Sequence, residues 1–149
     1  MPINRRSVFA RLIAAAGVLA TPVVAKAAIA DAGPPKVVYH LADVDKAGFV
    51  LGNIDNHIKG MGGPDKVKIV LVIHGPPLAL FTVAKAQIDV SRHVERLSKA
   101  GLAFVACGNT MAAQQLALAD LLPGFERADE GGVVRLAQLQ AQGYAYLRP

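Results

Sequence analysis

The side chain with the greatest nucleophilic potential in this sequence is its single cysteine, Cys107, which is followed by Gly108, Asn109 and Thr110. The thiolate is the nucleophilic form of cysteine, and the partly positive N–H groups at a helix N-terminus favour it over the thiol. Gly108 lets the backbone approach a ligand closely, while Asn109 and Thr110 can cap a helix or donate hydrogen bonds to an anion. Cys107 could therefore be a reactive thiol. The alternative is a small buried residue that ends a core strand, as free cysteines often are.

Two histidines could act together with this thiol. His74, which is followed by Gly75, could orient a ligand, accept a proton from the thiol or stabilise its anion. It could equally be a structural histidine whose ring nitrogens bond to nearby backbone. His40 is a weaker candidate, because it alternates within an expected strand and its side chain could face the core. The predicted site has Cys107 as its reactive group and the following ligand-binding residues: His74, Gly75, Gly108, Asn109 and Thr110.

Other chemistries find little support in the sequence. One cysteine and scattered histidines lack the paired spacing of metal sites, so neither a metal nor another cofactor is expected. The glycines at 60–63 follow a helical pattern rather than a strand, which is wrong for a dinucleotide-binding fingerprint. A hydrolase that used Cys107 and His74 would need an acid to orient the histidine, and the sequence identifies none.

The elements that must position these residues alternate between strands and helices. Apolar, β-branched runs predict strands, and apolar residues at helical spacing predict helices. The strands are expected at 37–41, 67–73, 102–106, 125–128 and 144–147. The helices are expected at about 47–61, 90–101, 112–122 and 133–142. This alternation predicts an α/β fold, a single-domain three-layer sandwich with a mostly parallel sheet of about five strands.

Parallel sheets bind ligands just beyond the carboxyl ends of their strands. In the expected topology, the segment 40–43 follows the first strand, His74 follows the second, and Cys107 follows the third. The sequence therefore predicts that His74 and Cys107 lie on the same rim of the sheet.

Residues 1–30 differ from the rest of the chain and read as a signal peptide. The segment 4–9, which contains Arg5 and Arg6, resembles a twin-arginine export motif, and an apolar stretch at 12–24 follows it. That stretch has about 13 residues, whereas a membrane-spanning helix needs about 20, so stable membrane insertion is not expected. We expect cleavage near Ala27 or Ala30 and a periplasmic or otherwise exported protein. An ordinary secretory signal is the alternative to the twin-arginine route.

The remaining residues, 31–149, form one expected domain with nearly balanced charge. The first 30 residues hold 4 of the chain's 16 basic residues and none of its acidic ones, which leaves 12 basic against 11 acidic residues. Nucleic-acid binding needs a basic patch on the folded domain, and the charge balance does not support one.

Three segments together resemble the DsrE/DsrF-like family. They are the run 67–73 leading into His74-Gly75, the run 103–106 leading into the segment 107–111, and the ending 136–146. The resemblance covers about residues 36–149. It implies a five-stranded α/β sandwich that assembles into homotrimers or homohexamers and, in some members, a cysteine that carries persulfide sulfur. Only Cys107 can be carried over as such a cysteine. Known sulfur carriers of the family are mostly cytoplasmic. The exported subtype that the leader indicates departs from this usual location.

Two functional hypotheses follow from the sequence. The first is an exported sulfur-handling or thiol-dependent protein with a sulfurtransferase-like role. In it Cys107 carries persulfide in exchange with a sulfur donor or acceptor protein or a small sulfur species. The second is a non-catalytic module of the periplasm that binds a small ligand or serves oligomeric assembly. Rapid alkylation of Cys107 in the folded protein favours the first, and protection of the thiol favours the second.

Overall fold

The computed structural model describes residues 33–149, so the leader expected at 1–30 and its cleavage sites lie outside the described residues. Five strands form the sheet: β1 (Lys36–Leu41), β2 (Lys68–Ile73), β3 (Ala103–Cys107), β4 (Phe125–Ala128) and β5 (Ala145–Leu147). Their order is β4-β3-β2-β1-β5, and every pair is parallel. The helices are α1 (Ala47–Gly60), α2 (Ile88–Lys99), α3 (Gly108–Ala113) and α4 (Gly132–Ala141).

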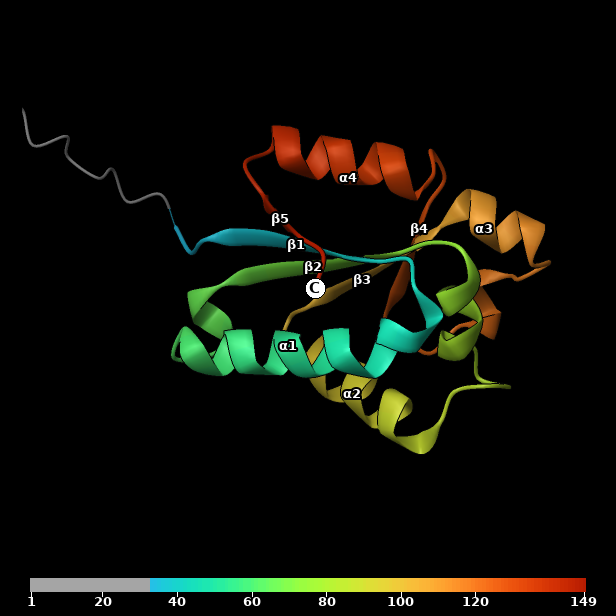
Figure 1. Ribbon diagram of the computed structural model, residues 1–149, viewed down its shortest axis with the longest axis horizontal. Coiled ribbons are helices and arrows are strands. Elements are labelled where there is room, and N and C mark those ends of the chain that lie inside the picture. Colours follow the sequence, from blue (N-terminus) through green and yellow to red (C-terminus); the bar gives the residue numbers. More distant parts are fainter. Residues whose placement is uncertain (1–32) are drawn as a thin grey trace, which may run out of the picture. The chain divides into compact units, whose positions relative to one another are not determined.

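Helices cover both faces of this sheet, with α1 and α2 on one face and α4 on the other (Figure 1). The larger core lies on the face of α1 and α2, where Leu71 and Phe104 of the strands pack with Ile54 and Leu97 of the helices. The smaller core lies beneath α4 and consists mostly of strand valines packed against Leu136 and Leu139 of the helix. The predicted three-layer α/β sandwich is therefore confirmed, and its sheet is wholly parallel.

The three central strands, β1, β2 and β3, were predictable because their side chains are buried on both faces. In β1 and β2 every residue after the first is buried, which requires a nearly continuous apolar run. Among residues 33–149, no helix combines the length and the apolar character that crossing a membrane would require.

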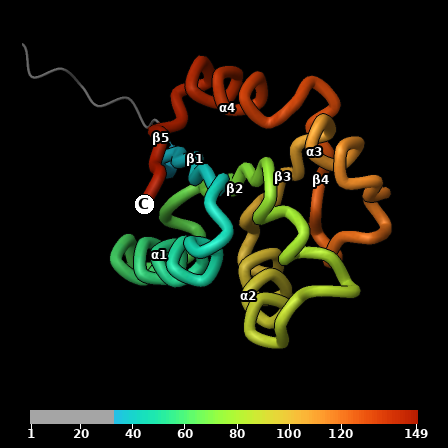
Figure 2. Tube along the Cα trace, turned by 45° about the vertical axis from the view of Figure 1, so that its right-hand side comes forward, coloured from blue at the N-terminus to red at the C-terminus, as the bar shows by residue number. Residues whose placement is uncertain are grey.

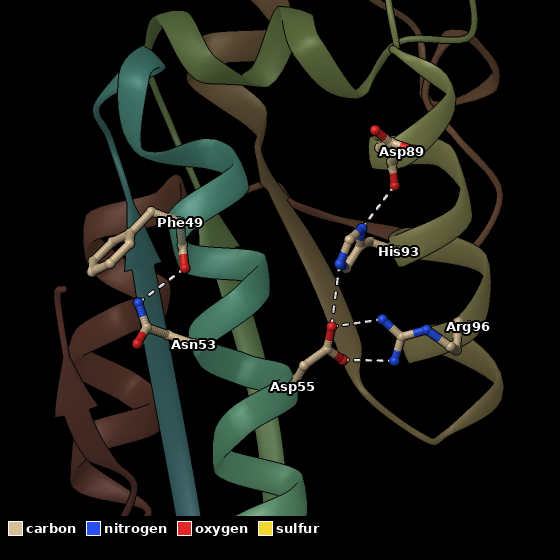
Figure 3. Close-up of polar contacts among 6 residues, drawn as sticks. All are labelled: Phe49, Asn53, Asp55, Asp89, His93 and Arg96. Carbon is tan, nitrogen blue, oxygen red and sulfur yellow. Dashed lines mark hydrogen bonds and ion pairs between the residues drawn. The ribbon is translucent and has the colours of Figure 1, made fainter.

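A polar contact joins α1 to α2 at the surface (Figure 3). Both carboxylate oxygens of Asp55 accept hydrogen bonds of 2.6 Å from the guanidinium of Arg96, and His93 Nε2 lies 3.2 Å from Asp55 Oδ2. The hydrogen bonds from Arg96 are the main reason that the pKa of Asp55 lies below its ordinary value. This network holds the two helices together on the side of the molecule away from α4.

One helix differs from its prediction. A helix was expected at 112–122, but α3 spans Gly108–Ala113 and therefore begins directly after Cys107. It ends early because Gln115 has a φ of 56°, in the left-handed region. The apolar residues beyond it include Leu121, which is buried in the larger core and pairs with Thr82 in an isolated β-bridge. Their helical spacing was therefore misleading.

Candidate functional site

Three side chains form a row along the carboxyl edge of the sheet. His40, His74 and Cys107 each come two residues after a valine that packs beneath α4. The backbone N–H of His74 still donates to Leu41 O at 3.1 Å, so the pairing of β1 with β2 extends to this residue. Because strand side chains alternate between faces, all three point toward the face that α4 covers.

The first turn of α4 lies directly over two members of this row. A Cβ on Gly132 would lie 3.2 Å from the Cβ atoms of both Cys107 and His74, and 3.6 Å from Cys107 Sγ. The preceding Gly131 has a φ of 94°, and a Cβ there would lie 2.7 Å from Nδ2 of Asn109. This pair of glycines allows the close approach, and Figure 2 shows the start of α4 beside α3.

Cys107 is only 6% exposed and lies where two helices begin. Burial is the largest single influence on its pKa and raises it. Hydrogen-bond donors outweigh burial, so the net pKa of the thiol lies below its ordinary value. The donors are the Thr110 hydroxyl and the backbone N–H groups of Gly132, Thr110 and Asn109. These donors stabilise the thiolate, which is the nucleophilic form.

Thr110 also ties the loop after β2 to α3. Its Oγ1 accepts a hydrogen bond of 2.9 Å from the backbone N–H of Gly75, which leaves its hydroxyl hydrogen for the sulfur of Cys107. Gln114 Nε2 donates to the carbonyl of Gly75 at 3.0 Å. Gly75 has a φ of 72°, a conformation that glycine adopts readily. Both backbone polar groups of Gly75 therefore tie the loop after β2 to side chains of α3 and its C-terminal end.

A small cavity of about 110 Å³ opens beside the sulfur. Its lining consists of His74, Cys107, Asn109, Glu130 and the segment 131–134 at the start of α4. Val133 is 69% exposed and Val134 is 47% exposed, so the mouth of the cavity has an apolar rim. Two larger hollows, of about 720 and 370 Å³, contain neither cysteine nor histidine in their linings.

The two histidines of the row lie against each other. The rings of His40 and His74 are stacked, with centroids 4.6 Å apart and an interplanar angle of 26°. Burial first, and then the charges of His74 and Arg148, lower the pKa of His40 to about 4. The pKa of His74 is also lowered, first by burial and then by Arg148, while Asp43 opposes both shifts. Both rings are therefore neutral at neutral pH, and His74 is able to accept a proton.

The predicted site residues fall into two groups. His74, Cys107 and Asn109 line the cavity, whereas Gly75 and Thr110 support it from behind through their mutual hydrogen bond. Gly108 is buried, and a Cβ there would lie 2.7 Å from Ala128 O, so this glycine permits close packing against the end of β4.

Sequence reasoning undervalued His40 and did not consider Tyr146 or the glycines at the start of α4. His40 has its ring on the same face as His74, and Nδ1 lies 2.6 Å from Tyr146 Oη. The sequence could have indicated His40 as a site residue, because it stands at the carboxyl end of a strand like the other two members of the row. Nothing in the sequence indicated that Gly131 and Gly132 would lie over Cys107.

Metal binding and hydrolysis are the two alternative chemistries for this region. Within residues 33–149, no group of three histidine, cysteine or acidic side chains is placed to hold a metal ion. Asp43, the carboxylate that influences the pKa of both histidines, forms an ion pair of 2.9 Å with Arg148 rather than a hydrogen bond with the His74 ring. Glu130 also lines the cavity, and among residues 33–149 neither it nor Asp43 forms the hydrogen bond to the His74 ring that a hydrolytic triad uses.

We expect Thr110→Val to raise the pKa of Cys107 and to slow its alkylation at neutral pH. The substitution removes a hydroxyl donor to the sulfur, and the rate should fall by about three- to tenfold. Alkylation rates measured against pH test this, with Thr82→Val as the matched control, because Thr82 is a buried threonine whose hydroxyl donates to Ala79 O instead. An unchanged profile for Thr110→Val would show that the hydroxyl does not stabilise the thiolate.

Comparisons with known proteins relate the chain to others through its fold. No protein-family model and no curated protein sequence matches it. Among solved structures, the protein of unknown function MTH1491 from Methanobacterium thermoautotrophicum matches with a TM-score of 0.68 and 26% identity. The match covers 77% of this chain and 99% of that one. The ychN protein from E. coli matches with a TM-score of 0.60 and 14% identity, over 78% of this chain and 99% of the other. Both neighbours have the DsrE/DsrF-like fold, and this chain shares it.

Proposed function

We propose that this protein is an exported sulfur carrier of the DsrE/DsrF-like type in which Cys107 holds sulfane sulfur as a persulfide. The observation that carries the proposal is the environment of the thiol. The Thr110 hydroxyl and the backbone N–H groups of Gly132, Thr110 and Asn109 lower the pKa of this thiol, which lies on the wall of a cavity that His74 also lines. The leader at residues 1–30 supports export to the periplasm.

The loading step is a sulfur transfer without net oxidation. The thiolate of Cys107 attacks the outer sulfur of a hydropersulfide or polysulfide donor, so that a new S–S bond forms on Sγ. The donor's own S–S bond breaks, and its electron pair leaves on the inner sulfur. The proton released from the Cys107 thiol passes through His74 to the departing thiolate. Unloading repeats these events in reverse toward an acceptor thiol.

The size and the lining of the cavity favour a small donor. A volume of about 110 Å³ accommodates an added sulfur atom and a small leaving group. Backbone N–H groups that stabilise the thiolate would also stabilise the terminal sulfur of a persulfide anion, because both carry negative charge at nearly the same place. A sulfur donor or acceptor protein would have to present its thiol at the rim formed by Val133 and Val134.

We expect the purified protein, after treatment with inorganic polysulfide, to gain the mass of one sulfur atom in intact-mass spectrometry. The gain should disappear on reduction, and Cys107→Ser should show none, because the persulfide forms on that sulfur alone. Sulfide without sulfane sulfur is the matched reagent control. If the wild-type protein gains no mass, or if Cys107→Ser gains the same mass, the proposal fails.

A binding or assembly module of the periplasm is the second candidate, and the 6% exposure of Cys107 favours it. In this case the cavity would hold a small anion at the start of α4, and a homotrimer or homohexamer would be the working unit. Thermal stabilisation by an anion that persists in Cys107→Ala would favour this candidate. Protection of Cys107 from alkylation in the folded protein would favour it as well.

A further inference from the structure

His40 contains a polar atom that the fold leaves without a partner. The residue is 8% exposed, its Nδ1 lies 2.6 Å from Tyr146 Oη, and its Nε2 has no hydrogen-bond partner among the described residues. A neutral imidazole has one donor nitrogen and one acceptor nitrogen, so Nε2 stays unpaired whichever tautomer Tyr146 selects. Buried unpaired atoms are uncommon because they are costly, and this one therefore calls for an explanation.

The ring of His40 is placed to hold the ring of His74. The two are stacked at 4.6 Å, and no hydrogen bond to the ring of His74 is present within residues 33–149. Backbone pairing fixes where His74 leaves the sheet, through its N–H to Leu41 O, but it does not fix the plane of the ring. The stacked contact with His40 is a contact that can set that plane.

Tyr146 in turn holds His40. It lies on β5, paired in register with Val38 of the neighbouring β1, so its side chain is on the same face as that of His40. Its ring lies 5.7 Å from the ring of His40, in addition to the hydrogen bond to Nδ1. The contacts therefore run from the edge strand to His40, then to His74, and then to the cavity of Cys107.

We propose that His40, supported by Tyr146, is a positioning residue that holds the imidazole of His74 at the wall of the Cys107 cavity. The inference rests on the proposed function, in which His74 carries the thiol proton. Neither His40 nor Tyr146 lines the cavity, so their effect passes through His74. The hydrogen bond of Nδ1 to Tyr146 and the stacked contact with His74 then account for a buried histidine ring at this place, and its unpaired Nε2 is a cost of that arrangement.

The charged and titratable groups around the two rings are few. Asp43 follows β1 and Arg148 follows β5, and they pair with each other at 2.9 Å. Beyond His74, Cys107 and Glu130 belong to the lining of the cavity, and the first turn of α4 brings Gly132 rather than a charged side chain over the row. Removal of His40 therefore leaves these charges in place and changes mainly the freedom of the His74 ring.

Three variants test the proposal, with the rate of Cys107 alkylation against pH and the side-chain NMR titration of His74 as readouts. We expect His40→Ala to slow alkylation at neutral pH by about tenfold and to shift the His74 titration, because the ring loses its support. His40→Phe keeps a stacked ring and should recover most of the rate. The alkylation rate of Tyr146→Phe should lie between the rates of wild type and His40→Ala. Tyr144→Phe is its matched control, because Tyr144 is a buried tyrosine of the smaller core.

The outcomes separate this inference from the proposed function. The positioning role is wrong if His40→Ala and wild type show the same alkylation profile and the same His74 titration. It is also wrong if Cys107 is alkylated as slowly in His40→Phe as in His40→Ala. Neither readout requires a sulfur donor, so a wild-type protein that forms no sulfur adduct would overturn the proposed function without deciding this test. Circular dichroism identifies a misfolded variant, and if His40→Ala is misfolded, His40→Phe, which keeps an aromatic ring at this position, decides the result.

Discussion

Replacing Gly132 with alanine is expected to slow the alkylation of Cys107 at neutral pH by about tenfold or more. The new methyl group would lie 3.2 Å from the Cβ atoms of Cys107 and His74 and 3.6 Å from the sulfur. The first turn of α4 would have to move away by a few tenths of an ångström, which weakens the hydrogen bond from the Gly132 N–H to the sulfur. Reactive sites are sensitive to such changes, and a misplacement of about 1 Å can cost roughly 100-fold.

The measurement is the alkylation rate as a function of pH, which separates a raised thiol pKa from a blocked approach. A raised pKa moves the profile to higher pH, whereas a blocked approach lowers the rate at every pH. Gly48→Ala is the matched control, because Gly48 is a helical glycine of α1 with nothing within 4 Å of its potential Cβ. If Gly132→Ala reacts like wild type, the start of α4 does not control the thiol.

We expect the protein to lose stability as the pH falls from about 6.5 to about 4. Burial and the neighbouring His74 lower the pKa of folded His40 from 6.5 to about 4. Between these values the unfolded chain binds a proton that the folded chain does not, so the free energy of unfolding rises with pH in this window. The stability lost through His40 is absent above about pH 6.5 and complete below about pH 4, and solvent screening around this partly buried ring keeps it below the roughly 3 kcal/mol that the full shift implies. His74 adds a smaller effect of the same sign.

Urea unfolding at several pH values tests this, with His40→Phe as the informative variant. That variant cannot take up a proton at position 40, so its stability should change much less between about pH 6.5 and 4. The carboxylate of Asp55 has a pKa below its ordinary value of 3.8, so its contribution is lost only as the pH falls further. If the free energy of unfolding changes equally with pH in wild type and in His40→Phe, His40 is not the neutral buried group described above.

The positions of the three central strands followed from the sequence because both of their faces are covered. A strand buried on both sides must be apolar almost throughout, and the run that became β2 has this pattern. The helix expected at 112–122 was wrong because Leu121 and its apolar neighbours reach the core from an irregular segment. Helical spacing alone does not distinguish these cases.

The sequence by itself determined the α/β class, the order of the elements, and the placement of His74 and Cys107 after neighbouring strands. These features depend on local periodicity and on the general geometry of parallel sheets. Only the tertiary structure decided which groups surround the sulfur. Gly132 lies 25 residues beyond Cys107 in the chain, and Tyr146 lies 106 residues beyond His40. Such contacts arise from strand order and helix packing, which bring distant segments together at one edge of the sheet.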